Sequence, residues 1–279
     1  MKIGEIIRIL ENVAPLSLQE SYDNAGLLTG NRDWICKGVL CTLDSTEAII
    51  DEAISKNCNL IIAHHPIIFK GLKQINGKNY VERTIIKAIK QDIAIYAIHT
   101  NLDNVIEGVN GRIADELGLV DRRILVPKSS TLKKLSCFVP LSHLEQVRSA
   151  LFEAGAGEIG KYSECSFTSE GSGTFRAGAG AEPYVGEIGK LQVEPEVKLE
   201  VVFQSSLQSH LLKSMKAAHP YEEMAYDIFS MDNPHPLIGS GLMGRLPQIM
   251  DEGAFLGLLK KKFKLSLIRH SSLLNKPVE

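Results

Sequence analysis

The stretch LIIAHHPIIF, residues 60 to 69, places two adjacent histidines and a proline inside an otherwise apolar run. The four apolar residues before His64 are typical of a buried strand, and Pro66 interrupts strand pairing because it has no amide hydrogen to donate. On a regular strand, His64 and His65 would face opposite sides of the sheet. We therefore expect both histidines to follow the strand, at its carboxyl end.

Strands and helices alternate around this stretch. The pattern predicts strands within residues 38–44, 59–63 and 92–98, and helices within residues 45–56, 81–91 and 103–119. Repeated strand-helix units with short apolar strands predict a mainly parallel sheet covered by helices. We therefore expect residues 1–128 to form the N-terminal part of an α/β domain.

The alternation stops near the turn-forming residues VPKSST at 126–131. Residues 129–232 then follow a strand-helix-strand-helix-strand order, which is typical of an α+β ferredoxin-like domain inserted into the first one. Residues 236–279 carry a strand, a helix near 251–263 and an apolar strand pattern at 265–270. We expect this last segment to return to the α/β domain and to leave it incomplete.

Composition excludes several classes of protein. The 31 Lys and Arg residues nearly balance the 33 Asp and Glu residues, so no overall field attracts nucleic acid or an anionic membrane. No apolar run approaches the ~20 residues of a membrane span, and the first 13 residues trace an amphipathic helix instead of a signal peptide. The balanced charge favours a small-molecule or protein partner, and the five cysteines form no C-x-x-C pair, so a cytoplasmic protein is expected.

Polar side chains follow three of the predicted strands: Asp44, the pair His64 and His65, and the segment 99–103 with His99 and Asp103. Ligands collect at the carboxyl edge of a parallel sheet, so we expect these side chains to share one crevice. Imidazole nitrogens and carboxylate oxygens without thiolates suit Zn, Fe, Mn, Co or Ni in a site that is not a structural zinc. The sequence therefore predicts a metal centre whose ligands include His64, His65 and Asp103.

Each of these residues also has an ordinary structural explanation. Asp103 alone would cap a helix N-terminus, and Asp44 would either cap a helix or hydrogen-bond a metal ligand from outside the coordination shell. His99 is a candidate catalytic residue for proton transfer or an outer-shell partner. The coincidence at three strand ends favours metal binding for His64, His65 and Asp103, whereas the alternatives for Asp44 and His99 remain balanced.

Four stretches resemble the Nif-three-like family, whose members are commonly labelled GTP cyclohydrolase 1 type 2 homologues: SYDNAGLLTG (21–30), LIIAHHPIIFKGLK (60–73), IHTNLDNVIEGVN (98–110) and AHPYEEMAYDIF (218–229). The resemblance implies two divalent metal ions in a mixed α/β domain, a PII-like inserted domain and ring-shaped homohexamers. It also implies that His64, His65 and Asp103 are metal ligands.

The sequence departs from the family in one respect. The family completes its centre with a C-terminal Gly-His-x-x-x-Glu segment, and this sequence contains none. His219 and Glu223 have the same mutual spacing but match the motif of the inserted domain, so local packing is favoured for them. The chain is therefore either a fragment or a shortened form, in which we expect weak or partial metal occupancy.

Two functions follow from this reading. The leading hypothesis is a metal-dependent hydrolase of a nucleotide or phosphoester, resembling GTP cyclohydrolase 1 type 2, in which a water molecule activated by the metals is the nucleophile. The alternative is a non-catalytic, ring-forming metal-binding or regulatory scaffold. Hydrolysis assays with substitutions at His64 and Asp103 distinguish the two.

Overall fold

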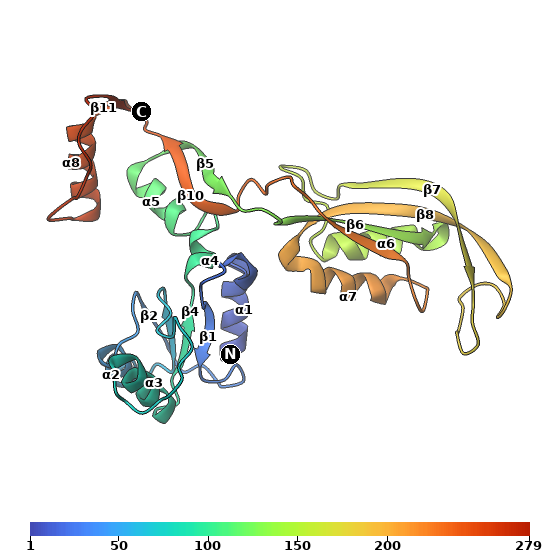
Figure 1. The fold of residues 1–279 in the computed structure, drawn as a ribbon, viewed down its shortest axis with the longest axis horizontal. Helices are drawn as coiled ribbons and strands as arrows, with labels where there is room; N and C mark the ends of the chain where they lie inside the picture. Colours follow the sequence, from blue (N-terminus) through green and yellow to red (C-terminus); the bar gives the residue numbers. More distant parts are fainter. The chain divides into compact units, whose positions relative to one another are not determined.

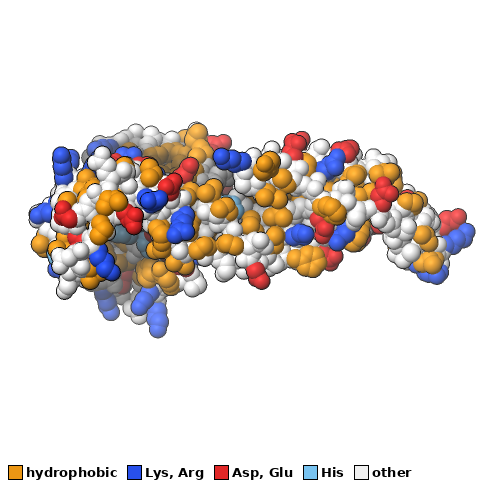
Figure 2. Space-filling model, turned by 90° about the horizontal axis from the view of Figure 1, so that it is seen from above, with side chains coloured by type: hydrophobic (Ala, Val, Ile, Leu, Met, Phe, Trp, Pro, Cys, Tyr) orange, Lys and Arg blue, Asp and Glu red, His pale blue; other side chains and the backbone are white.

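The computed structural model describes all 279 residues, which form two compact units within a mixed α/β fold (Figure 1). The first unit comprises Met1–Pro127 and Leu237–Glu279, and the second comprises Lys128–Pro236. No helix has the length and apolar character needed to cross a membrane. Acidic and basic side chains are interspersed with hydrophobic ones over the face drawn in Figure 2.

A four-stranded sheet with the order β1-β4-β3-β2 forms the centre of the first unit. Its strands are β1 (Gly26–Thr29), β2 (Val39–Thr42), β3 (Leu60–Ala63) and β4 (Ala94–Ala97). Strands β2, β3 and β4 run parallel, as the alternating pattern predicts, while β1 pairs with β4 in the antiparallel direction. The carboxyl ends of β3 and β4 therefore meet at the same edge of the sheet.

Helices cover both faces of this sheet (Figure 1). Helix α1 (Ile3–Val13) packs on one face against Leu60, and helices α2 (Glu47–Ser55) and α3 (Tyr80–Lys90) pack on the other against Ile61. Leu60 and Ile61 are both fully buried. Truncating either to alanine should cost about 2–5 kcal/mol of stability, so the strand that leads to His64 is held firmly on both sides.

The helix predicted at residues 103–119 is shorter in the structure: α5 spans Val109–Leu117, and a separate short helix, α4 (Thr100–Asp103), lies before it. The chain turns back on itself between them at Gly108, where an added Cβ atom would lie 1.8 Å from the carbonyl oxygen of Leu102. Only glycine permits so close a backbone approach. Helix α4 ends at Asp103, whose carbonyl oxygen accepts a hydrogen bond from the side-chain amide of Asn110 in α5 at 3.0 Å.

The rest of the first unit departs most from the sequence prediction. Strand β5 (Val120–Pro127), which was not predicted, pairs with β10 (Gly239–Arg245) in an antiparallel two-stranded sheet. Helix α8 (Glu252–Phe263) is preceded by β11 (Met250–Asp251), which pairs with β12 (Pro277–Val278). The strand predicted at 265–270 was wrong: this segment is irregular, because an apolar alternation becomes a strand only where a neighbouring strand takes its backbone hydrogen bonds.

The second unit is an antiparallel sheet with two helices on one face (Figure 1). In chain order its elements are β6 (Leu132–Pro140), α6 (Leu144–Glu153), β7 (Ser166–Arg176), β8 (Leu191–Gln204), α7 (Gln208–Ala218) and β9 (Tyr226–Ser230). The strand order is β7-β8-β6-β9. Val197, Leu199 and Val201 pack with the helices in the core, so the alternate residues Glu196 and Lys198 point to the opposite, helix-free face.

Candidate metal centre

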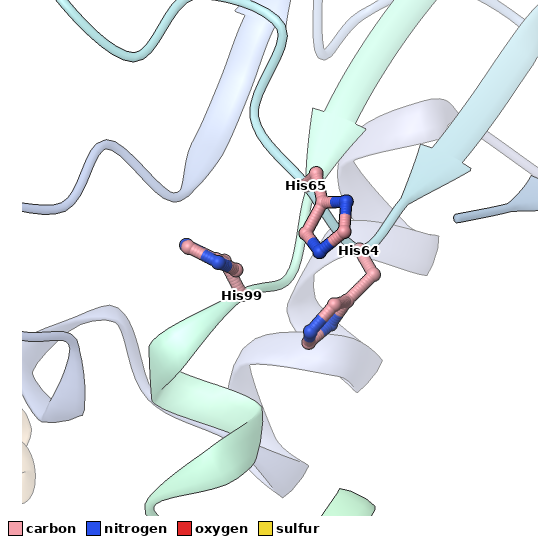
Figure 3. Close-up of side chains that lie close together, drawn as sticks. All are labelled: His64, His65 and His99. Atoms are coloured by element: carbon pink, nitrogen blue, oxygen red, sulfur yellow. The ribbon is translucent and has the colours of Figure 1, made fainter. Parts of the chain in front are cut away.

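Three histidines converge at the carboxyl edge of the first sheet (Figure 3). His64 and His65 follow β3 directly, and His99 lies between β4 and α4. One ligand nitrogen from each ring lies within 4.8 Å of the others. The group could therefore hold a metal ion through imidazole nitrogens, at the sheet edge where the strand pattern placed these side chains.

Backbone hydrogen bonds continue beyond β3 and fix the two adjacent histidines. The amide of His64 donates to the carbonyl oxygen of Thr42 at 3.1 Å, and the amide of His65 donates to that of Leu43 at 2.9 Å. Strand β3 itself ends at Ala63, before the histidines. Two successive imidazoles thus leave the sheet with their rings 5.1 Å apart between centroids, instead of on opposite faces.

The rings of His64 and His65 present the same nitrogen to the centre. Nδ1 of His64 lies 2.9 Å from the carbonyl oxygen of Ile98, and Nδ1 of His65 lies 2.8 Å from Oδ1 of Asp44. Because a carbonyl or an ionised carboxylate only accepts hydrogen bonds, each Nδ1 carries the proton. Each Nε2 then keeps the lone pair that a metal ion needs.

His99 follows the same rule through a buried carboxylate. Its Nδ1 lies 2.8 Å from Oδ1 of Asp23, whose side chain is fully buried. The amide of Asn24 donates to Oδ1 of Asp23 at 2.7 Å, and the amide and hydroxyl of Thr100 donate to Oδ2. Burial alone would raise the pKa of Asp23, but the hydrogen bonds from His99, Thr100 and Asn24 outweigh it and lower that pKa. Asp23 is therefore a carboxylate that fixes the His99 ring.

Asp103 lies beside the three rings. Its Oδ1 is 3.9 Å from Nε2 of His64, and its side chain is about one-third exposed. Asp103 is the last residue of α4, so the alternative that it caps a helix N-terminus does not hold. Asp44 contacts the group only through His65, while His219 and Glu223 lie in the second unit.

Two exposed aromatic side chains border the histidines. Phe69 and His99 have ring centroids 6.4 Å apart, and Tyr22 lies 6.3 Å from Phe69. Tyr22 is 64% exposed and Phe69 is 44% exposed. No sequence pattern marks either of these residues or Asp23, although all three fall within the stretches that resemble the family.

The donors in this group fit a divalent transition metal ion. Three imidazoles with available Nε2 atoms and one carboxylate are the nitrogen and oxygen ligands that Zn, Fe, Mn, Co and Ni accept. Each imidazole is also hydrogen-bonded on its far side, which orients ligands in known metal sites. The chemistry of the residues therefore agrees with a metal centre at this edge of the sheet.

Comparisons with known proteins agree on one family. The model of the Duf34/NIF3 family (NGG1p interacting factor 3) matches residues 1–279. A Bacillus subtilis protein named "GTP cyclohydrolase 1 type 2 homolog" is 43% identical over 266 residues, which are 95% of this chain and 71% of that protein. A Staphylococcus epidermidis protein with the same name is 36% identical over 279 residues, which are 100% of this chain and 76% of that protein.

Solved structures give the same result. A Bacillus cereus protein described as related to NIF3 aligns with a TM-score of 0.84 and 41% identity, covering 99% of this chain and 74% of that one. A Staphylococcus aureus protein aligns with a TM-score of 0.71 and 31% identity, covering 99% of this chain and 73% of that one. The resemblance found in the HHP and NLD segments thus extends along the whole chain, which belongs to the Duf34/NIF3 family.

Proposed function

We propose that this chain is a metal-dependent hydrolase of a nucleotide or phosphoester, with His64, His65 and Asp103 as its metal ligands. The observation that carries the proposal is the common orientation of the imidazoles, whose Nδ1 atoms are all occupied by acceptors. Two divalent metal ions held there would lower the pKa of a coordinated water and supply a nucleophile near neutral pH. The curated relatives named after GTP cyclohydrolase support this class of reaction.

His99 is the proton-transfer residue in this proposal. Its ring belongs to the same group as the other two histidines, and because its Nδ1 is bound to buried Asp23, the lone pair of its Nε2 is available. A carboxylate behind an imidazole stabilises the imidazolium form, so His99 is suited to accept a proton at Nε2 from the attacking water. Asp23 acts through His99 and does not touch the substrate.

The aromatic pair supports a substrate with a planar ring. Tyr22 is 64% exposed and Phe69 is 44% exposed, and the Phe69 ring centroid lies 6.4 Å from that of His99. Exposed aromatic faces beside a reaction centre can stack a nucleobase, which contributes about 1–3 kcal/mol per base in known complexes. A nucleotide base bound on Phe69 would lie beside the His99 ring.

The second unit belongs to the PII-like type of ferredoxin-like domain in this proposal, inserted at residues 129–232 into the metal-binding domain. This assignment is supported by the β6-α6-β7-β8-α7-β9 chain order and the β7-β8-β6-β9 sheet. The alternative function, a non-catalytic regulatory scaffold assembled as a cytoplasmic homohexamer, is favoured if this unit binds a ligand while the metal centre shows no turnover.

Hydrolysis assays test the proposal directly. The purified chain is stripped with a chelator, reloaded with Zn, Mn, Fe, Co or Ni, and assayed with GTP and a panel of phosphoesters. We expect His64→Ala and Asp103→Ala to lose metal and activity together, and His99→Ala to keep metal while losing activity by about 10²–10⁴-fold.

The matched control is His210→Ala, because His210 is an exposed histidine on α7 in the second unit. This variant should retain full activity and metal content. Hydrolysis that survives both His64→Ala and Asp103→Ala would exclude this centre as its source. Metal binding without turnover of any substrate would support the scaffold instead.

A further inference from the structure

A pocket of about 680 Å³ lies in the second unit. Strands β7 and β8 contribute its floor, and the segments around Tyr184 and Tyr221 contribute its walls. All of its residues belong to Lys128–Pro236, so it is separate from the histidines of the metal centre. Its volume falls within the range of small-molecule sites.

Glycines keep the floor of this pocket open. Gly171 of β7 pairs with Glu196 of β8 on the helix-free face. A Cβ atom added at Gly173 would lie 2.2 Å from Oε2 of Glu196, whereas one added at Gly171 would meet nothing within 4 Å. Gly173 thus makes room for the Glu196 carboxylate, and Gly171 leaves unfilled space beside it.

Aromatic rings line the wall of the pocket. The ring centroid of Tyr221 lies 5.9 Å from that of Tyr184 and 6.4 Å from that of Phe175. His219 positions Tyr221: its Nδ1 accepts a hydrogen bond from the Tyr221 amide at 3.1 Å, and its Nε2 donates to the Phe138 carbonyl at 3.0 Å. The histidine of the HPYEE segment therefore serves to hold an aromatic side chain in the pocket.

The charges in the pocket are mainly negative. Its lining contains one lysine, Lys198, which pairs with Glu200 at 3.1 Å. The carboxylates that line it are Glu170, Glu196, Glu222 and Glu223. Oε1 of Glu196 accepts a hydrogen bond from the Tyr221 hydroxyl at 2.9 Å, and no lysine, arginine or histidine pairs with this carboxylate. Glu196 therefore brings an unneutralised negative charge to the aromatic wall.

We propose that this pocket binds a small organic cation that carries an aromatic ring. Its ammonium group lies against Glu196 and the face of Tyr221, where a carboxylate and an aromatic ring both attract a cation. Its own ring packs against Phe175 and Tyr184 over the glycine floor. An anion of the same shape is repelled by the surrounding carboxylates, and a neutral analogue loses the charge-assisted contact.

Three matched probes test this inference on the full chain by isothermal titration calorimetry at pH 7: tryptamine, its neutral analogue tryptophol, and the anion indole-3-propionate. They share an indole ring and differ in charge. We expect tryptamine to bind at least about tenfold more tightly than either of the others. Failure of tryptamine to bind at about 10 mM, or equal binding of the anion, would overturn the proposal.

Two variants assign the binding to this pocket. Glu196→Gln should weaken the binding of tryptamine about tenfold. It should leave the binding of tryptophol unchanged, since the glutamine amide oxygen still accepts a hydrogen bond from the Tyr221 hydroxyl. Gly171→Leu should abolish binding of all three probes, because its side chain fills the open floor. Ser166→Leu, at an exposed position on the same strand that does not line the pocket, is the control. Unchanged tryptamine binding in both pocket variants would refute the site.

Discussion

The histidines of the two units use their ring nitrogens differently. His64, His65 and His99 each have an acceptor at Nδ1, which leaves the lone pair of Nε2 available in rings that lie close together. His219 has partners on both nitrogens, the Tyr221 amide and the Phe138 carbonyl. A histidine with an unused lone pair can bind a metal, whereas one with both nitrogens occupied is a structural crosslink.

Burial follows the same division. His219 is 7% exposed, and burial lowers its pKa below the ordinary value of 6.5 against the opposing effects of the Phe138 carbonyl and Glu196. The side chain of His65, in contrast, is 46% exposed, so a metal ion can reach the group from solvent. Spacing alone made His219 and Glu223 resemble a ligand pair, but hydrogen bonding excludes that role for His219.

The largest expected effect is the loss of metal from a variant of the group. His64→Gln removes an imidazole whose Nε2 faces both the other rings and Asp103, and we expect zinc affinity to fall by at least about 100-fold. His219→Gln should leave zinc affinity unchanged. Titration with zinc and a competing chelator measures both. Equal losses of zinc affinity in the two variants would mean that a free Nε2 lone pair does not distinguish metal-binding histidines from structural ones.

A smaller effect, on activity instead of metal content, is expected when the support of His99 is removed. Asp23→Asn replaces the buried carboxylate behind His99, so the ring loses its charged acceptor while the shape is kept. We expect hydrolysis to fall by about 10–100-fold, the usual cost of losing such a partner, while zinc affinity stays the same because His99 is not one of the proposed ligands. Hydrolysis assays and the same zinc titration measure the two quantities, with circular dichroism to establish folding. Full activity would show that the orientation of His99 does not depend on Asp23, and a zinc loss as large as in His64→Gln would show that His99 is itself a ligand.

The corresponding change at Asp44 should cost less. Asp44 orients His65 at 2.8 Å, but its side chain is 60% exposed, so water can replace it as the acceptor. We expect Asp44→Asn to lower zinc affinity only a few-fold, far below the loss in His64→Gln. A loss as large as that in His64→Gln would indicate that Asp44 itself binds the metal.

The sequence predicted the placement of His64 and His65 because the relevant signals are local. An apolar strand followed by Pro66 sets the end of β3, and parallel neighbours bring the end of β4 to the same edge. Asp23 could not be found in this way, since it lies 76 residues before His99 and meets it only through tertiary contacts. A polar residue in a loop has no periodicity that marks its partner.

The same limit explains the errors in the first unit. The apolar pattern at 265–270 resembles that of a strand, yet strand formation depends on a neighbour that the pattern does not specify. The helix predicted at 103–119 begins only at Val109, after Gly108 approaches the backbone of Leu102, a steric requirement that the apolar spacing of 103–119 does not reveal. Local patterns thus predicted the types of element well and their tertiary partners poorly.

The last expected effect concerns the stability of the second unit at low pH. Because the pKa of His219 is lowered in the folded state, the unfolded chain binds a proton more readily as the pH falls below 6.5. The contribution of His219 to the free energy of unfolding is therefore fully present above pH 6.5. It is lost on acidification, by at most about 1.4 kcal/mol per pH unit. His219→Asn should remove this contribution and make the pH dependence shallower.

Urea unfolding at pH 7.5 and 5.5 measures this difference. The single tryptophan, Trp34, lies in the first unit, so its fluorescence reports that unit, while far-ultraviolet circular dichroism reports both. The transition seen by circular dichroism but not by fluorescence belongs to the second unit. If His219→Asn retains the full pH dependence of that transition, the loss of stability at low pH comes from other titrating groups. His219 would then not be a buried, neutral crosslink, and this difference from the metal-centre histidines would not hold.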